Sequence, residues 1–326
     1  MRLVGAVSEQ GSLMPIESML ITAIRTGKLI FDITFSPDGR WLALATGSGA
    51  VPVIEVATWR EHFVVRQGSW FNPYALGVAF SPDGRWLATC GVDLTARVWD
   101  AHTGKQLLKL RHRIGKNPGA GLPKVQAVAF SPDSRWLATG SADCTARIFD
   151  AATGQELLRV TNSPGVNGVV FSPDGRWLAT SGAKTRIWDA ASGKQLASVT
   201  HDLCMGVAFS PDGRRLATGG SDGIGRVWDA QSGAELLQVS HGARVQDVAF
   251  SSDGRWLATC GGNTAQIWDA ATGKQLASVT HDCSVGPLPP CLAGYVALAF
   301  SPDSYLLATC VQYTAQVWRL RDREDG

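Results

Sequence analysis

Three side chains in the second half of the chain, His201, Thr218 and Asp222, have the residue types of a nucleophile triad. In such a triad a histidine takes the proton from a hydroxyl nucleophile, and an acidic group orients the histidine. The Thr and the Asp recur with the same spacing in two earlier segments, at Thr89 and Asp93 and at Thr139 and Asp143. Because the pattern repeats, we expect these side chains to be buried and to hold loops together.

Cysteine and histidine residues raise the separate question of a metal site. His281, Cys283 and Cys291 fall within one segment, and zinc is held by such ligands. Their spacing is not that of a CxxC pair and no fourth ligand is evident, so we predict no metal and no cofactor. The sequence also lacks a phosphate-binding P-loop, an HExxH motif and a GxSxG motif, so we predict no catalytic residues.

A repeated string determines the architecture. FSPDGRWLAT, or a near copy, recurs at intervals of 38 to 50 residues. The copies begin at Phe35, Phe80, Phe130, Phe171, Phe209, Phe250 and Phe300. Length alone would suggest two domains, but repeats over almost the whole chain predict a single repeat architecture.

Each unit has the apolar period of β-strands. Val78 and Phe80 flank Ala79, and further strands follow at 86–90, 95–100 and 106–110. In the Ser-Pro-Asp-Gly-Arg turn between the first two strands, glycine takes a left-handed conformation. Ser134 and Ser304 replace that glycine, at a cost of about 1–2 kcal/mol each if the backbone is the same. Each unit therefore predicts four antiparallel strands.

Trp-Asp pairs end the third strand of several units, at Trp99-Asp100, Trp188-Asp189, Trp228-Asp229 and Trp268-Asp269. With the FSPDG and LAT strings, the chain resembles the WD-repeat family of β-propellers, and its very regular repeats resemble bacterial members. The resemblance covers about residues 19–320. It implies an all-β, seven-bladed propeller made of four-stranded antiparallel blades.

The same resemblance implies a buried hydrogen-bond set in each blade, made of His, Ser/Thr, Asp and Trp. Blade five holds all four residues, as His201, Thr218, Asp222 and Trp228. Blade two has three of them and no closely placed histidine: Thr89, Asp93 and Trp99. In blade three, Phe149 replaces the tryptophan and cannot donate a hydrogen bond.

The two ends of the chain are expected to share a blade. The last unit ends after its third strand, while residues near Met19 to Ile24 align with the fourth strand of another blade. We therefore predict that an N-terminal strand completes blade seven and closes the ring. The predicted organisation is an N-terminal segment of unknown role at 1–18, the propeller at 19–320 and a C-terminal tail at 321–326.

Comparison of the repeats predicts a binding face. The turns after the first and third strands are nearly constant, whereas the loops before the first strand vary and are long before blades two, three and seven. Aromatic and arginine residues in such loops are typical of interface hot spots. The predicted partner-binding residues are Trp70, Phe71, Tyr74, Arg111, His112, Arg113, Lys116, Lys124 and Tyr295.

Charge and composition exclude several classes of partner and location. The net charge of +2 does not indicate a nucleic-acid partner, and no apolar stretch is long enough to span a membrane. The apolar run at the N-terminus is too short for a signal peptide. Seven cysteines, an odd number, indicate free thiols in a reducing compartment. We expect a cytoplasmic, monomeric propeller.

Three functions fit this chain to different degrees. We predict a non-catalytic scaffold that binds a protein or peptide on the face with the variable loops. The first alternative is a sensor or regulatory propeller module of a larger signalling protein, because bacterial WD-repeat arrays often follow NTPase or kinase domains. The second is a small-ligand binder or enzyme that uses the central channel, where Asp32 and Asp247 are the few polar residues of the first strands.

Overall fold

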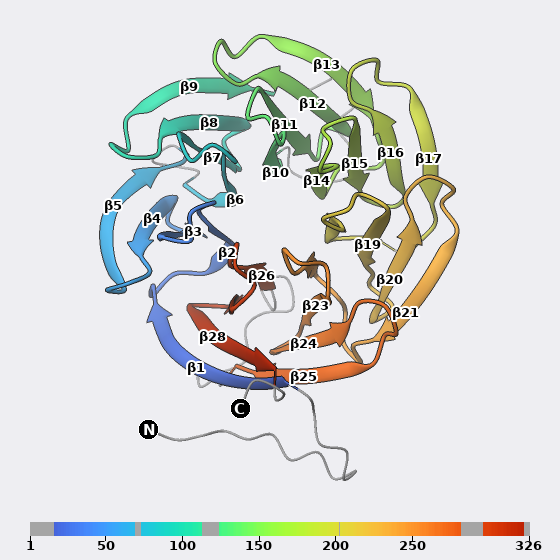
Figure 1. Cartoon of the computed structure of the whole chain (residues 1–326). Coiled ribbons are helices and arrows are strands. Elements are labelled where there is room, and N and C mark those ends of the chain that lie inside the picture. Colours follow the sequence, from blue (N-terminus) through green and yellow to red (C-terminus); the bar gives the residue numbers. More distant parts are fainter. Residues whose placement is uncertain (1–15, 69–72, 113–123, 202, 282–295, 323–326) are drawn as a thin grey trace.

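Seven four-stranded antiparallel sheets form a closed ring (Figure 1). The structure, a computed structural model, describes residues 16–68, 73–112, 124–201, 203–281 and 296–322. The regular elements of these ranges are all strands, and none of these ranges contains a helix able to cross a bilayer. The predicted all-β, seven-bladed propeller is confirmed.

Within each of the first three blades the strands are neighbours in chain order. Blade one contains β2 (Ile30–Phe35), β3 (Trp41–Thr46), β4 (Ala50–Glu55) and β5 (Arg60–Arg66). Blade two contains β6 (Ala75–Phe80), β7 (Trp86–Gly91), β8 (Thr95–Asp100) and β9 (Gln106–Arg111). Blade three contains β10 (Val125–Phe130), β11 (Trp136–Ser141), β12 (Thr145–Asp150) and β13 (Glu156–Thr161).

The next three blades repeat this order. Blade four contains β14 (Gly168–Phe171), β15 (Trp177–Ser181), β16 (Thr185–Asp189) and β17 (Gln195–Val199). Blade five contains β18 (Val207–Phe209), β19 (Arg215–Gly219), β20 (Ile224–Asp229) and β21 (Glu235–Ser240). Blade six contains β22 (Asp247–Phe250), β23 (Trp256–Gly261), β24 (Thr264–Asp269) and β25 (Gln275–Thr280).

Blade seven is built from both ends of the chain. Its first three strands are β26 (Val296–Phe300), β27 (Leu306–Val311) and β28 (Thr314–Asp322), and β1 (Ile16–Arg25) is the fourth. β1 pairs antiparallel with β28, from Ile16 opposite Asp322 to Arg25 opposite Thr314. The predicted closure is confirmed, and the closing strand begins at Ile16, inside the segment assigned to 1–18.

The core lies between adjacent blades. A leucine in the second strand of every blade has no exposed surface, and these are Leu42, Leu87, Leu137, Leu178, Leu216, Leu257 and Leu307. The tryptophan that begins the second strand lies beside the phenylalanine of the next blade, as Trp86 does with Phe130 at 6.2 Å between ring centroids. Packing of this kind buries apolar surface between blades and stabilises the ring as one unit.

The two serines that replace a turn glycine keep the glycine backbone. Their φ angles are +61° at Ser134 and +63° at Ser304, in the left-handed region. Each hydroxyl also accepts a hydrogen bond from the turn of the preceding blade, at 3.1 Å from the Asp83 N–H and 3.0 Å from the Ser252 N–H. The strain expected at these positions is therefore offset by a link between blades that glycine could not make.

Candidate functional site

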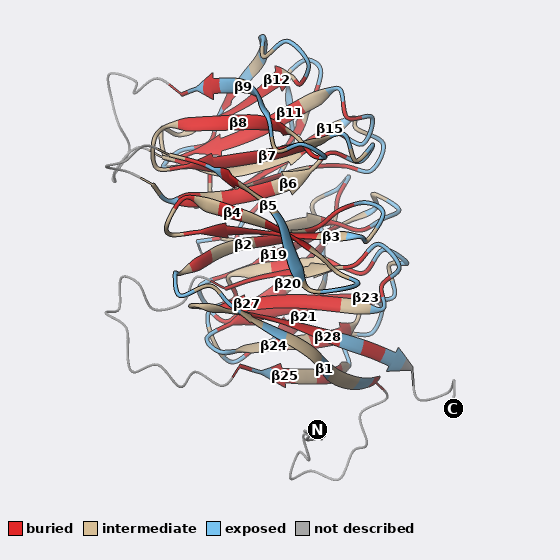
Figure 2. Ribbon diagram, turned by 90° about the vertical axis from the view of Figure 1, so that its left-hand side faces the viewer, coloured by how far each residue is buried: buried red, intermediate tan, exposed pale blue. Residues whose placement is uncertain are grey.

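The connections between strands lie on two opposite faces of the ring. Loops that precede a first strand are hydrogen-bonded to the loop after the second strand of the same blade, as the Ala142 N–H is to the Lys124 carbonyl at 3.0 Å. We call the face that carries these two sets of loops the variable face. The turns after first and third strands form the turn face, which lies along the opposite edge of the ring in side view (Figure 2).

Polar groups on the turn face are satisfied within their own turns. In blade two the Ser81 hydroxyl donates to Asp83 at 2.6 Å, and the Arg85 N–H donates to the same carboxylate at 3.1 Å. After the third strand, the Thr103 hydroxyl and N–H both donate to Asp100 and lower the pKa of that carboxyl. The serine–aspartate bond recurs in all seven blades, and the bonds after the third strand recur in blades two to six, so these carboxylates maintain turn shape.

One shallow cavity of about 430 Å³ opens on the turn face between blades three and four. Trp136, Arg176 and Asp189 are among its lining residues. Asp189 accepts hydrogen bonds from the Ser192 hydroxyl and N–H, so its carboxylate is already used by its own turn. The lining carboxylates Asp133 and Asp174 likewise accept hydrogen bonds from the serines of their own turns, each at 2.6 Å, so the polar groups of this cavity maintain turn shape.

In blade five the structure brings together His201, Thr218, Asp222 and Trp228. The His201 ring nitrogens lie 2.8 Å from the Thr218 hydroxyl and 3.2 Å from Asp222. The Trp228 indole N–H donates to the same hydroxyl at 2.8 Å. Thr218 has no exposed surface and Arg226 pairs with Asp222 at 2.7 Å, so a substrate cannot reach the hydroxyl. This arrangement links loops and strands and is not a nucleophile triad.

Blade two makes the same connections without a histidine. Trp99 donates to Thr89 at 2.9 Å, and the Thr89 hydroxyl donates to the Gln67 amide oxygen at 2.7 Å. The Gln67 amide nitrogen donates to Asp93 at 2.8 Å. Sequence reasoning missed Gln67, although its place directly after the fourth strand, where other blades carry histidine, is a signal that could have found it.

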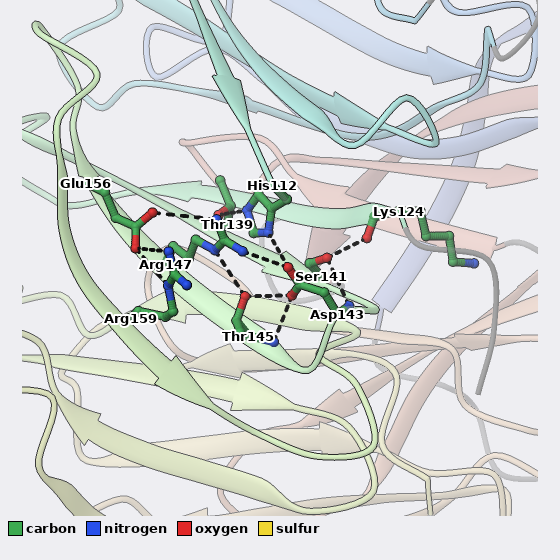
Figure 3. A network of polar contacts seen from close by, with 9 residues as sticks. All are labelled: His112, Lys124, Thr139, Ser141, Asp143, Thr145, Arg147, Glu156 and Arg159. Atoms are coloured by element: carbon green, nitrogen blue, oxygen red, sulfur yellow. Dashed lines mark hydrogen bonds and ion pairs between the residues drawn. The ribbon is translucent and has the colours of Figure 1, made fainter. Parts of the chain in front are cut away.

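His112 does not lie on a binding surface, contrary to our prediction. It is 3% exposed, and its ring lies 2.7 Å from the Thr139 hydroxyl and 3.3 Å from Asp143 (Figure 3). Burial lowers its pKa, despite the opposing effect of Asp143. The prediction was wrong because His112 begins a long cationic loop and was assigned to the binding surface together with that loop. The histidine bonds to Thr139 and Asp143 even though Phe149 contributes none.

Histidines at the corresponding position of blades six and seven are also internal. His241 lies 2.9 Å from the Thr259 hydroxyl, and His281 lies 2.7 Å from that of Thr309. Burial lowers the pKa of His281 to about 4. Cys283 and Cys291, considered with it as zinc ligands, lie outside the described residues. No group of His, Cys, Asp and Glu suited to a metal occurs within the described ranges.

The two carboxylates of the first strands brace neighbouring blades. Asp32 accepts the N–H of Val78 in the next blade at 2.9 Å, and Asp247 accepts that of Leu298 at 3.1 Å. Each also accepts the N–H of the residue that follows it. Burial raises the pKa of Asp32 to about 7 and that of Asp247 to about 6. Both oxygens of each carboxylate are thus occupied by backbone.

The other predicted partner-binding residues are only partly described. Tyr74 and Arg111 are exposed, and Lys124 is half-buried, with its pKa lowered by burial. The remaining ones lie outside the described residues: Trp70, Phe71, Arg113, Lys116 and Tyr295. Of the predicted patch, the structure therefore places Tyr74, Arg111 and Lys124 on the variable face.

An aromatic pair marks the variable face between blades one and two. The rings of Tyr74 and Phe31 lie 5.9 Å apart, and Tyr74 is 47% exposed. Gly47 gives both rings room, since an added Cβ would lie 3.3 Å from Phe31 and 3.6 Å from Tyr74. Sequence reasoning missed Phe31, which differs from the residues at the same position in other blades: Leu76, Gln126, Asn167, Met205, Gln246 and Val296.

A family model described as "WD domain, G-beta repeat" matches the chain at residues 68–100, 115–150, 155–189, 193–229 and 234–269. These matches cover more than half of the chain and fall on blades two to six. Blades one and seven have the same four strands but lie outside the matches. No curated protein matches the sequence.

Proposed function

Because the chain belongs to the WD-repeat family of β-propellers, we propose that it is a non-catalytic scaffold that binds a protein or peptide on the variable face. The carrying observation is the Tyr74–Phe31 pair, in which the half-buried Phe31 ring supports a Tyr74 ring that is 47% exposed. A rigid, half-exposed aromatic side chain loses little entropy on binding and buries a large apolar area.

The use of polar side chains elsewhere supports binding over catalysis. Each triad-like histidine described above is buried against a threonine, and the first-strand carboxylates are bound to backbone N–H groups. A catalytic site needs a nucleophile or base that can reach a substrate. The exposed chemistry of the variable face is instead aromatic and cationic, which is typical of interface centres.

Tyr74→Ala tests the proposal, with Tyr305→Ala as its matched control. Tyr305 lies on the turn face and is 63% exposed, against 47% for Tyr74, so the control removes a side chain at least as accessible from the opposite face of the propeller. Peptides selected from a displayed library on the wild-type protein, and partners captured from lysate of the source cells, are then measured against both variants. We expect Tyr74→Ala to weaken binding about tenfold or more, as for a hot-spot residue.

Tyr305→Ala should leave that binding unchanged. Equal losses in the two variants, or no loss in either, would place the partner away from the aromatic pair and contradict the proposal. Thermal melting of both variants keeps the comparison valid, because each side chain projects from the surface and its removal should leave the ring folded.

A further inference from the structure

One position at the rim of the variable face divides the ring into two arcs. It is the residue at the end of each blade's fourth strand, or just after it in blade four, directly before the histidine position that serves the next blade. In blades seven, one and two this residue is arginine: Arg25, Arg66 and Arg111. In blades three to six it is a small hydroxyl residue: Thr161, Thr200, Ser240 and Thr280. The three arginines end β1, β5 and β9, which follow one another around the outside of the ring (Figure 1).

The three arginines are available to a partner. All are exposed, and none forms an ion pair with another residue of the described ranges. Lys28, which is exposed, and the half-buried Lys124 add positive charge in the loops next to them. We call Arg25, Arg66 and Arg111 the arginine arc.

Negative charge on the described part of the variable face is already neutralised. The carboxylates in its loops are Asp93, Asp143 and Asp222, and each pairs with a third-strand arginine at 2.9, 2.8 and 2.7 Å respectively. Figure 3 shows this for Asp143, held between Arg147 and His112. These carboxylates are fixed by internal partners, so the described loops around the arginine arc offer it no free counter-charge.

The arginine arc shares two blades with the aromatic pair. Phe31 belongs to the first strand of blade one and Tyr74 to the loop before blade two, so the pair lies on the two blades whose rims carry Arg66 and Arg111. Apolar contacts are thus offered at the inner strands and cationic contacts at the outer strands of the same two blades, whereas the rim of blades three to six offers hydroxyl groups. This difference between the two arcs favours a negatively charged partner that lies over blades seven, one and two.

We propose that the arginine arc binds an acidic segment of a partner protein, whose carboxylates meet Arg25, Arg66 and Arg111 while an apolar side chain contacts Tyr74 and Phe31. This rests on the proposed scaffold function and specifies the chemistry of its partner. Guanidinium groups suit carboxylates because they donate two parallel hydrogen bonds to them. A nucleic acid is less well matched, since three rim arginines in a chain of net charge +2 do not form the basic surface that a phosphate backbone needs.

The test compares two triple charge reversals of equal size. Arg25→Glu/Arg66→Glu/Arg111→Glu removes the arginine arc. Arg135→Glu/Arg176→Glu/Arg214→Glu makes the same change at exposed turn-face positions on consecutive blades. The probes are a short fluorescent peptide of Glu and Ala with a central Phe, its analogue with Gln in place of Glu, and a single-stranded oligothymidine. Circular dichroism and melting establish that each variant is folded.

We expect the wild type to bind the Glu peptide at least about tenfold more tightly than the Gln analogue, with affinity that falls as salt is added. The arginine-arc variant should lose this preference and the turn-face variant should keep it. Equal binding of the Glu and Gln peptides to the wild type, equal losses in both variants, or tighter binding of oligothymidine than of the Glu peptide would each overturn the inference. If captured partners depend on Tyr74 but not on the arginine arc, the scaffold function stands and only the acidic partner is refuted.

Discussion

The two faces of this ring use similar polar residues in opposite ways. On the turn face every blade places an aspartate where its own serine hydroxyl and backbone N–H groups reach it, as Asp83 shows with Ser81 and Arg85. On the variable face the aspartates pair with inner arginines such as Arg97, and the outer cations have no such partner in the described ranges. The serine and aspartate that shape the turn face recur in every blade, whereas the exposed cations of the variable face differ between blades.

Removal of β1 is expected to have the largest effect, because both faces depend on a closed ring. Deletion of residues 1–25 would expose the edge of β28 and the buried Ile16 site, and should cost more than about 5 kcal/mol, a large part of the stability of a typical domain. Thermal melting by circular dichroism measures this. Deletion of residues 1–15, which leaves β1 complete, is the control and should melt like the wild type. A full-length melting temperature after the longer deletion would disprove the role of the clasp.

The second prediction compares the polar bonds that support the two faces within blade five. Thr218→Val leaves the buried His201 ring and the Trp228 N–H without their shared partner, and should cost about 2–4 kcal/mol. Ser232→Ala removes an exposed turn-face bond to Asp229 and should cost less than about 1 kcal/mol. Urea denaturation gives both values. Similar losses of unfolding free energy in the two variants would mean that the buried hydrogen bonds contribute no more to stability than the exposed ones.

The third prediction concerns pH. The pKa of His281 falls from 6.5 to about 4 on folding, so the folded state binds its proton less readily. Its contribution to stability is complete above pH 6.5 and is lost as the pH falls toward 4. The contribution of Asp32 to stability depends on pH in the opposite direction. Its pKa rises from 3.8 to about 7 on folding, so this contribution is lost as the pH rises through that range.

Two variants separate these contributions. His281→Gln, which imitates the Gln67 arrangement of blade two, should lessen the loss of stability between pH 8 and pH 5 by about 2 kcal/mol. Asp32→Asn should change the slope in the opposite direction. Urea titrations at several pH values give both slopes, and slopes that change in the same direction would refute the assignment.

The smallest effect is expected where a turn-face serine replaces glycine. Ser134→Gly relieves a left-handed backbone but removes the bond from the Asp83 N–H, so the two should nearly cancel, to within about 1 kcal/mol. Gly84→Ala, at φ +72° in blade two, is the control, because alanine adds the left-handed strain without a hydroxyl, and it should cost about 1–2 kcal/mol. Calorimetric melting measures the change in stability of both variants. A gain of well over 1 kcal/mol in Ser134→Gly would show that the link between blades does not offset the strain.

The ring was predictable because the residues that build it recur. The FSPDG turn, the alternating strands and the alignment of Ile24 with Val239 were enough to place seven blades and the closing strand. Strand ends were close as well: the predicted 106–110 is β9, Gln106–Arg111. The N-terminal boundary was three residues late, since the run from Ile16 to Ser18 contains no repeat motif that would mark it as strand.

The candidate site was less predictable because one geometry can be reached by different side chains. Glutamine makes the histidine connections in blade two, and His112 makes them in blade three without the expected tryptophan. His112 was misassigned because it begins a long cationic loop, and sequence alone does not show that its ring turns inward. Phe31 was missed because it belongs to a first strand, whereas we searched the loops for binding residues.

The pairing of β1 with β28 also governs when the protein can become complete during its synthesis. Thr22 pairs with Val317, which is made 295 residues later. At ribosomal rates of about 5–20 residues per second, β1 waits on the order of 15–60 s for its partner. Blades one to six can form as they emerge, but blade seven cannot. Until then β1 is a free strand able to pair with another chain, and a chaperone that covers it would protect the nascent ring.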